Sequence, residues 1–203
     1  MGAVLAGGDS RRMGRDKALL EWQGRSLLAR AVEELGGVIE EVFIVAPDDR
    51  GYADLGVEIV PDIRPGLGPV AGIHAALVRA TGRPVFVLAC DMPYVGRDLV
   101  HWIVDMVQRT TMISDEQRRT QAWVVHDGAG PQPLCGIYAA HSLTVVDQAL
   151  AENRRSARGL LDSLVTEELT LDPEKSWYRP DLLTSVNDLE SLAELTAGRR
   201  ALP

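Results

Sequence analysis

Short runs of apolar residues alternate along the chain with longer segments whose apolar residues recur at helical spacing. Runs that are apolar on both faces and separated by helices are typical of a mainly parallel sheet covered by helices on both sides. The sequence therefore predicts an α/β fold. The expected strands are residues 2–6, 42–46, 57–60, 85–89, 123–125, 134–138 and 168–171, and the expected helices are residues 18–35, 72–81, 98–107, 142–150, 157–164 and 189–196.

Three connecting segments have their own expected conformations. Gly36 and Gly37 are expected to end the first helix in the left-handed conformation that glycine accepts. The stretch Thr110–Thr120 is polar, has no apolar period and is predicted to be an exposed loop. The stretch Asp127–Pro131 contains two glycines and ends on a proline, and it is predicted to be the turn between two strands.

The composition is that of one ordinary globular domain over residues 1–203, with 46% hydrophobic and 25% charged residues. A net charge of −8 argues against a basic nucleic-acid surface. No run approaches the roughly 18 apolar residues that a membrane helix needs, so no membrane contact is expected. The first residues do not resemble a signal peptide, so the expected location is the cytoplasm. Cys90 and Cys135 lie in apolar stretches and are predicted to be core thiols.

The loop after the first predicted strand is the strongest anomaly of this acidic chain. Residues 5–17 read LAGGDSRRMGRDK, with a pair of glycines and four cations, Arg11, Arg12, Arg15 and Lys17. Glycines let a ligand approach the backbone closely, and backbone N–H groups near a helix start can cradle an anion. A polyphosphate ligand explains this pattern. The alternative is a plain strand-to-helix connection with a solvated basic face.

Two common phosphate-binding motifs do not match this loop. The Walker pattern requires Gly-Lys followed by Ser or Thr, whereas Gly14 is followed by Arg15 and Asp16. The dinucleotide fingerprint requires G-x-G-x-x-G, whereas the glycines here are adjacent and then distant.

The segment LAGGDSRRMGRDKALL resembles the signature of the nucleotidyltransferases, and most of all that of the molybdenum cofactor guanylyltransferases. These enzymes transfer GMP from GTP to molybdopterin and release pyrophosphate. The pattern L-A-G-G-x-S-x-R-M-G-x-D-K is matched at every specified position. The resemblance implies a three-layer α/β/α domain whose mainly parallel, Rossmann-like sheet has one antiparallel strand. It also implies that the chain up to about residue 95 binds the nucleotide and that the remainder binds the acceptor.

The resemblance assigns roles to individual residues of the loop. It implies that Arg12 and Lys17 neutralise charge on the phosphates during catalysis, and that the loop binds the nucleotide. The nucleotide-binding residues implied here are Leu5, Ala6, Gly7, Gly8 and Lys17.

Asp62 follows the third predicted strand and leads into the glycine- and proline-rich segment Arg64–Ile73. From the residues alone, Asp62 caps a turn or accepts hydrogen bonds from a base or ribose. The resemblance implies the second role, a contact with the guanine nucleotide. The sister cytidylyltransferases tend to have G-M-S-S-S-L where this chain has Gly68–Ile73 with the letters GPVAGI, which favours guanine.

Asp91 follows the fourth predicted strand within the sequence CDMP. Mg²⁺ prefers one or two carboxylates together with phosphate oxygens and waters. The alternative from the residues alone is a carboxylate that caps the next turn. The resemblance implies that Asp91 binds the metal, and so contributes to both nucleotide binding and catalysis with Mg²⁺ as cofactor.

The acceptor half carries weaker signals. The resemblance places Gln132 beside the acceptor, although a plain turn residue is an equal alternative. The segment Ser185–Glu190 resembles a late family motif in which Asn187 contacts the acceptor or the nucleotide. Ser185 replaces a carboxylate or amide of that motif, so a second metal site is doubtful. The basic cluster Arg154, Arg155 and Arg158 either contacts the acceptor phosphate or forms a solvated helix face.

The expected function is the transfer of GMP from GTP to molybdopterin. Its small-molecule partners are then GTP and molybdopterin, with transient contacts to proteins that make or receive the cofactor. The alternatives are cytidylyl transfer to the same cofactor, another small nucleotidyltransferase, or a nucleotide-binding regulatory protein without catalysis. Metal-dependent turnover separates the last of these from the enzymes.

Overall fold

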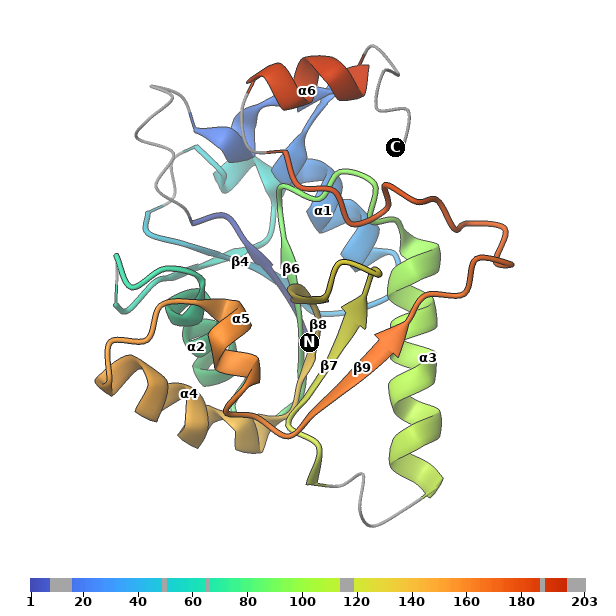
Figure 1. Cartoon of the computed structure of the whole chain (residues 1–203). Helices are drawn as coiled ribbons and strands as arrows, with labels where there is room; N and C mark the ends of the chain where they lie inside the picture. Colours follow the sequence, from blue (N-terminus) through green and yellow to red (C-terminus); the bar gives the residue numbers. More distant parts are fainter. Residues whose placement is uncertain (8–15, 49–50, 65, 114–118, 187–188, 197–203) are drawn as a thin grey trace.

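A computed structural model describes residues 1–7, 16–48, 51–64, 66–113, 119–186 and 189–196 of the chain (Figure 1). Within these residues, seven strands form one sheet in the order β5-β4-β1-β6-β8-β7-β9. These strands are β1 (Gly2–Leu5), β4 (Val42–Ala46), β5 (Glu58–Pro61), β6 (Val85–Ala89), β7 (Ala122–His126), β8 (Pro131–Tyr138) and β9 (Thr166–Thr170).

The direction of the strands confirms the expected sheet. β5, β4, β1 and β6 pair in parallel, and β7 pairs in parallel with β9. Only β8 among them runs the other way, and it pairs antiparallel with both β6 and β7. The fold is thus a mainly parallel α/β sheet with one antiparallel strand.

Helices cover both faces of the sheet, as the apolar runs predict (Figure 1). Successive residues of β1 point to opposite faces of the sheet, and all of them are apolar. Val4 packs against one set of helices, whereas Ala3 and Leu5 pack against the other set. The first set is α1 (Leu27–Gly36) and α3 (Arg97–Ile113), and the second is α2 (Pro69–Ala80), α4 (Leu143–Ala151) and α5 (Ala157–Leu161). A further helix, α6 (Leu189–Thr196), agrees with the predicted residues.

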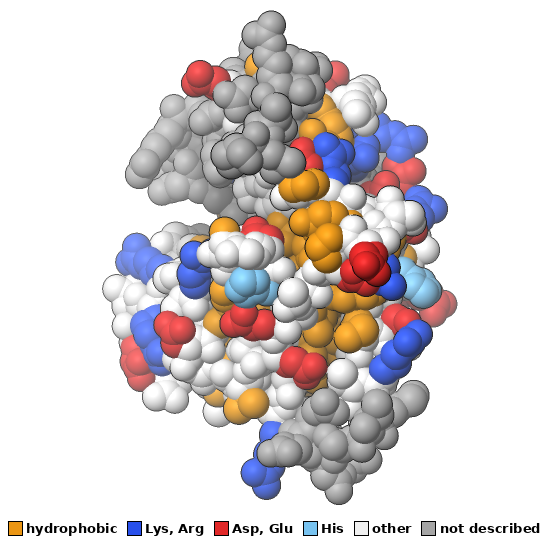
Figure 2. All heavy atoms as spheres, turned by 45° about the vertical axis from the view of Figure 1, so that its right-hand side comes forward, with side chains coloured by type: hydrophobic (Ala, Val, Ile, Leu, Met, Phe, Trp, Pro, Cys, Tyr) orange, Lys and Arg blue, Asp and Glu red, His pale blue; other side chains and the backbone are white. Residues whose placement is uncertain are grey.

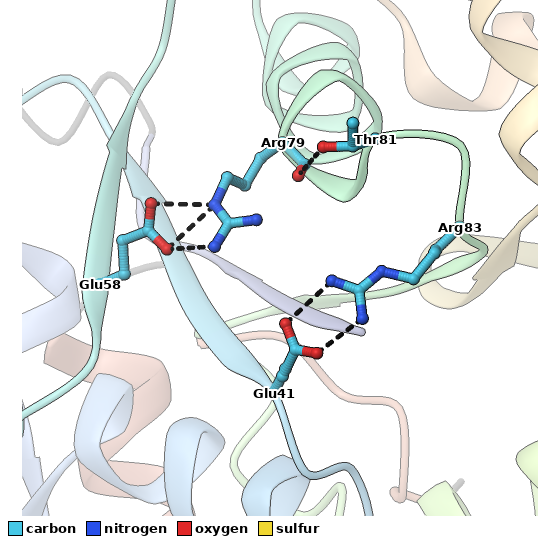
Figure 3. Close-up of polar contacts among 5 residues, drawn as sticks. All are labelled: Glu41, Glu58, Arg79, Thr81 and Arg83. Carbon is cyan, nitrogen blue, oxygen red and sulfur yellow. Dashed lines mark hydrogen bonds and ion pairs between the residues drawn. The ribbon is translucent and has the colours of Figure 1, made fainter.

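Two ion pairs link neighbouring elements at the amino edge of the sheet (Figure 3). Arg79 at the end of α2 donates to Glu58 at the start of β5, with a closest N–O distance of 2.6 Å. Arg83 donates to both carboxylate oxygens of Glu41, which lies just before β4. Each hydrogen-bonded guanidinium lowers the pKa of its carboxylate partner. All four side chains are well exposed, so these pairs orient the helix and strand ends rather than dominate stability.

The helix predicted over residues 18–35 is wrong in its first half. The structure has a 3-10 turn at Lys17–Leu19, then a hairpin of β2 (Glu21–Trp22) and β3 (Arg25–Ser26). Gln23 and Gly24 both have positive φ, the conformation of a two-residue hairpin turn. Helix α1 begins only after this hairpin, where the Ser26 hydroxyl accepts a hydrogen bond from the amide of Ala29. The helical spacing of the leucines before the hairpin is therefore coincidental.

The loop predicted over Thr110–Thr120 is also wrong in its first residues, 110–113. Helix α3 continues to Ile113, and the hydroxyls of Thr110 and Thr111 donate to carbonyls of the preceding turn. Polar residues therefore continue this helix on an exposed end. Helix α1 does end at Gly36 as predicted, but Gly37 has φ −68 and closes it in the right-handed conformation.

One glycine of β8 is required by close backbone contact. At the register shift between Val124 and Val125 of β7, a Cβ on Gly136 would lie 2.2 Å from the carbonyl oxygen of Trp123. No rotamer relieves such a contact, because the opposing atoms are backbone.

Candidate active site

The carboxyl ends of β1, β4, β5 and β6 meet at one edge of the sheet, where open α/β sheets bind ligands. A cavity of about 100 Å³ lies there, lined by the end of β1, Lys17, Pro69 and Asp91. A larger cavity of about 380 Å³ lies at the opposite edge, but Glu58 and Arg79 in its wall are paired with each other. The carboxyl edge is therefore the candidate active site.

Lys17 and Asp91 are brought together although 74 residues separate them. The Nζ atom of Lys17 lies 2.7 Å from Oδ2 of Asp91, and the two side chains are 18% and 21% exposed. Asp91 lies two residues after the end of β6, and Lys17 begins the 3-10 turn. The site thus holds a cation and a carboxylate next to each other and open to the same cavity.

The turn that carries Lys17 is itself held in place by hydrogen bonds. Asp16 Oδ1 accepts from the amide of Ala18, at 3.0 Å. Asp16 Oδ2 accepts from the hydroxyl of Tyr52, a fully buried residue in the segment after β4. Tyr52 therefore fixes the residue next to Lys17. Sequence reasoning missed Tyr52, because a tyrosine between two strands carries no signal of its partner.

The end of β1 forms the wall of the site. Leu5, Ala6 and Gly7 line the cavity. The amide of Ala6 donates to the carbonyl of Val45, and the Leu5 carbonyl accepts from the amide of Cys90. These groups tie the wall to β4 and to the start of the Asp91 loop. Gly8, Arg11, Arg12 and Arg15 lie outside the described residues.

The position of Asp62 is compatible with both roles considered for it, capping a turn and contacting the nucleotide. Its Oδ1 accepts from the amide of Arg64 at 2.9 Å, so it does cap a turn. It also lines a small cavity of about 20 Å³ together with Gly7, Gly68 and Pro69, next to the first cavity. Gly68 has φ +71, and helix α2 starts at Pro69, the position where proline is best tolerated. Asp62 therefore stands at a pocket formed by a helix start and the β1 wall.

The late motif also reaches this site. The amide of Val186 donates to the carbonyl of Asp91 at 2.8 Å, which places the residues beside Ser185 against the Asp91 loop. The sequence pointed to this segment through the resemblance of Ser185–Glu190 to a late motif of the family. Asn187 itself lies outside the described residues.

Gln132 lies at the start of β8, at the same edge of the sheet. Its Nε2 donates to Asp127 Oδ2 at 2.8 Å. Leu134, two residues along β8, lines the first cavity. Gln132 is thus near the site but is held by another side chain, and its role stays a prediction.

The three arginines of the second basic cluster have different partners. Arg154 donates to the hydroxyl of Ser163 and pairs with Glu152, so it holds its own segment together. Arg155 donates to Asn153, while its backbone carbonyl lies against Gly68. The Arg158 guanidinium lies beside Gly130 in the turn before β8. Of the three, Arg158 is the one whose guanidinium lies at the turn beside the predicted acceptor residue.

Cys90 lies next to Asp91 and is buried. Burial, helped by the neighbouring Asp91 carboxylate, raises the pKa of the Cys90 thiol, which therefore stays protonated.

Among the described residues, no group of three or more His, Cys, Asp or Glu side chains forms a metal site. The described helices include none long and apolar enough to cross a membrane.

Comparison with known proteins identifies relatives over most of the chain. Residues 2–169 match the model of the MobA-like NTP transferase domain. A probable molybdenum cofactor guanylyltransferase from Opitutus terrae is 35% identical over 184 residues, covering 87% of this chain and 86% of the relative. One from Methanothermobacter thermautotrophicus is 32% identical over 186 residues, covering 87% and 91%.

Solved structures support the same fold. The molybdopterin-guanine dinucleotide biosynthesis protein A from Archaeoglobus fulgidus superposes with a TM-score of 0.78 at 22% identity, covering 99% of each chain. The 2-C-methyl-D-erythritol 4-phosphate cytidylyltransferase from Thermus thermophilus has a TM-score of 0.64 at 15% identity, covering 98% of each chain. These likenesses bear on the fold alone.

Proposed function

Because the chain belongs to the MobA-like NTP transferase family, we propose that it transfers GMP from GTP to the phosphate of molybdopterin. The products are pyrophosphate and the guanine dinucleotide form of the cofactor. The observation that carries this proposal is the contact of 2.7 Å between Lys17 and Asp91 in the cavity at the carboxyl edge. Both residues belong to motifs from which the sequence predicts this activity.

The transfer needs charge stabilisation and no protein nucleophile. A phosphate oxygen of the acceptor forms a bond to the α-phosphorus, and the bond from that phosphorus to the pyrophosphate oxygen breaks. Negative charge then grows on the departing pyrophosphate. The Lys17 ammonium, held by its turn and by Asp91, is a fixed positive charge for this purpose.

Asp91 suits Mg²⁺ when a nucleotide is bound. It is a single carboxylate at a cavity, and Mg²⁺ is commonly held by one or two carboxylates together with substrate phosphates and waters. Asp91 Oδ2 is hydrogen-bonded to Lys17, and the carboxylate can still accept further bonds. A bound Mg²⁺ supplies charge neutralisation to the phosphate oxygens. Asp91 is the residue that would hold it.

Guanine is favoured over cytosine by the relatives. Two relatives named probable molybdenum cofactor guanylyltransferase are 36% and 35% identical to this chain, whereas two cytidylyltransferases of solved structure are 15% and 12% identical. Asp62, at the small cavity beside the end of β1, is the group proposed to contact the guanine. The proposed location is the cytoplasm, with transient contacts to proteins that make or receive the cofactor.

The test is pyrophosphate release from GTP, CTP, ATP and UTP, each with Mg²⁺ and with or without molybdopterin. We expect release from GTP that depends on molybdopterin. Asp91→Asn is expected to abolish it, whereas Asp98→Asn, an exposed carboxylate in the first turn of α3, is expected to retain it. Release from CTP alone would make the protein a cytidylyltransferase. A folded protein that releases pyrophosphate from none of the four would contradict the proposal.

A further inference from the structure

A second cavity lies at the carboxyl edge of the sheet, on the far side of β8 from Asp91. Its volume is about 370 Å³, and it lies between the turn after β7, the end of β9 and the segment 178–183. Figure 2 turns this side of the molecule forward and shows hydrophobic side chains gathered among acidic and basic ones. The function proposed above gives this cavity no role.

The cavity combines an apolar wall with a fixed carboxylate. Leu171, Leu182 and Leu183 line it, together with the ring of Tyr178. Asp127 also lines it, and its carboxylate is held by the amide of Ala129 at 3.0 Å and by Gln132 Nε2 at 2.8 Å. Two bonds leave a carboxylate with further lone pairs, so Asp127 can accept from a ligand without moving. Hydrophobic and aromatic walls with a few fixed polar groups are typical of pockets that bind small molecules.

The cavity lies within reach of the Asp91 site. β7 is two strands from β6 in the sheet, and strands are spaced about 4.8 Å apart, so the two strand ends are roughly 10 Å apart. Leu134 of β8 lines the first cavity, while Gln132 of the same strand holds Asp127. The segment that forms the outer wall continues to Val186, whose amide donates to the Asp91 carbonyl. The distance between Asp91 and this cavity is therefore within the length of one extended ligand.

We propose that this cavity binds the pterin ring of the acceptor and that Asp127 is its specificity-determining residue. This inference rests on the proposed function and assigns the acceptor's heterocycle to one pocket. Guanine and pterin share an edge formed by a ring N–H and a 2-amino group, and a carboxylate accepts from both. Asp62 lies on one side of the Lys17–Asp91 pair and Asp127 on the other. The site thus offers one carboxylate to each heterocycle of a dinucleotide product.

A negatively charged ligand is a poor occupant of this cavity. Arg179 in its wall is paired with Asp181 through two hydrogen bonds, the longer of them 2.8 Å. His126 accepts from the amide of Gly128 through Nδ1, and its Nε2 lies 3.6 Å from Glu168. The carboxylate of Asp127 therefore sets the charge that a ligand meets, and it favours N–H donors over an anion.

The test uses binding of 6-hydroxymethylpterin, measured by its fluorescence, to the full chain and to two variants. Asp127→Asn keeps the size of the side chain and removes its charge. Asp172→Asn is the matched control, because Asp172 follows Leu171 of the cavity wall but does not line the cavity and pairs with Lys175 instead. We expect Asp127→Asn to weaken pterin binding by about tenfold or more, as for a lost hydrogen bond to a charged group, and Asp172→Asn to leave it unchanged.

Turnover supplies the second readout. Asp127→Asn is expected to raise KM for molybdopterin by a similar factor and to leave KM for GTP unchanged. Pterin that fails to bind, that binds Asp127→Asn as tightly as the unaltered chain, or that GTP displaces would overturn the inference. Those results would leave GMP transfer standing. An unaltered chain that binds the pterin but transfers no nucleotide would refute the proposed function instead.

Discussion

Replacing Lys17 by alanine removes the positive charge that lies 2.7 Å from Asp91. Removal of one group that stabilises transition-state charge costs about 3 kcal/mol, which corresponds to about a hundredfold in rate. The effect on folding is smaller. The two side chains are about one fifth exposed, between an exposed pair worth about 0 to 1 kcal/mol and a buried pair whose disruption costs about 3 to 5 kcal/mol. We therefore expect a loss of stability of about 1 to 2 kcal/mol.

Steady-state pyrophosphate release and thermal unfolding measure the two effects separately. For a chain of this size, the expected stability loss lowers Tm by roughly 2 to 8 °C, so the variant stays folded at 25 °C. Lys175→Ala is the control, since Lys175 pairs with Asp172 at 3.8 Å and both are nearly half exposed. A Lys17→Ala variant with kcat within about threefold of the unaltered chain would contradict a role for Lys17 in stabilising transition-state charge.

Three further predictions follow from particular contacts. Tyr52→Phe removes the hydroxyl that donates to Asp16 and is expected to lower kcat about fivefold. Tyr138→Phe removes a hydroxyl that donates to the Pro133 carbonyl and is expected to lower only the Tm, so equal kcat values in the two variants would contradict a positioning role for Tyr52. Gly136→Ala places a Cβ 2.2 Å from a backbone oxygen and should reduce the free energy of unfolding by more than about 3 kcal/mol in denaturant titration, whereas Gly36→Ala, with 3.9 Å to its nearest contact, should not. Burial raises the pKa of the Cys135 thiol to about 12 and that of Cys90 further still, so neither is expected to react with a thiol reagent at pH 8 until the chain is unfolded; rapid labelling of the folded chain would contradict this.

The strands were predictable because burial on both faces leaves a direct trace in the sequence. Val85–Ala89 and Val42–Ala46 agree with the structure at both ends. Helix ends were less predictable. The hairpin at Gln23-Gly24 depends on two residues with positive φ, and the leucines around it also fit a helix. A local turn signal overrode the apolar period there.

The site was partly predictable for the same reason. Asp62 and Asp91 follow apolar strands, so their meeting at one sheet edge follows from parallel pairing. Lys17 was reached through the motif in which it lies. Tyr52 was not predictable, because its contact with Asp16 depends on the path of the chain after β4. The cavity at Asp127 was likewise beyond the sequence, since its outer wall comes from a segment with no regular period.

The identity of the product decides directly whether the protein transfers GMP to molybdopterin. The measurement is mass spectrometry of the cofactor after incubation of the protein with molybdopterin, Mg²⁺ and an equal mixture of GTP and CTP. We expect a product heavier than molybdopterin by one guanylyl group, formed by the unaltered chain and lost with Asp91→Asn. A product that carries a cytidylyl group, or molybdopterin recovered unchanged from folded protein, would contradict GMP transfer.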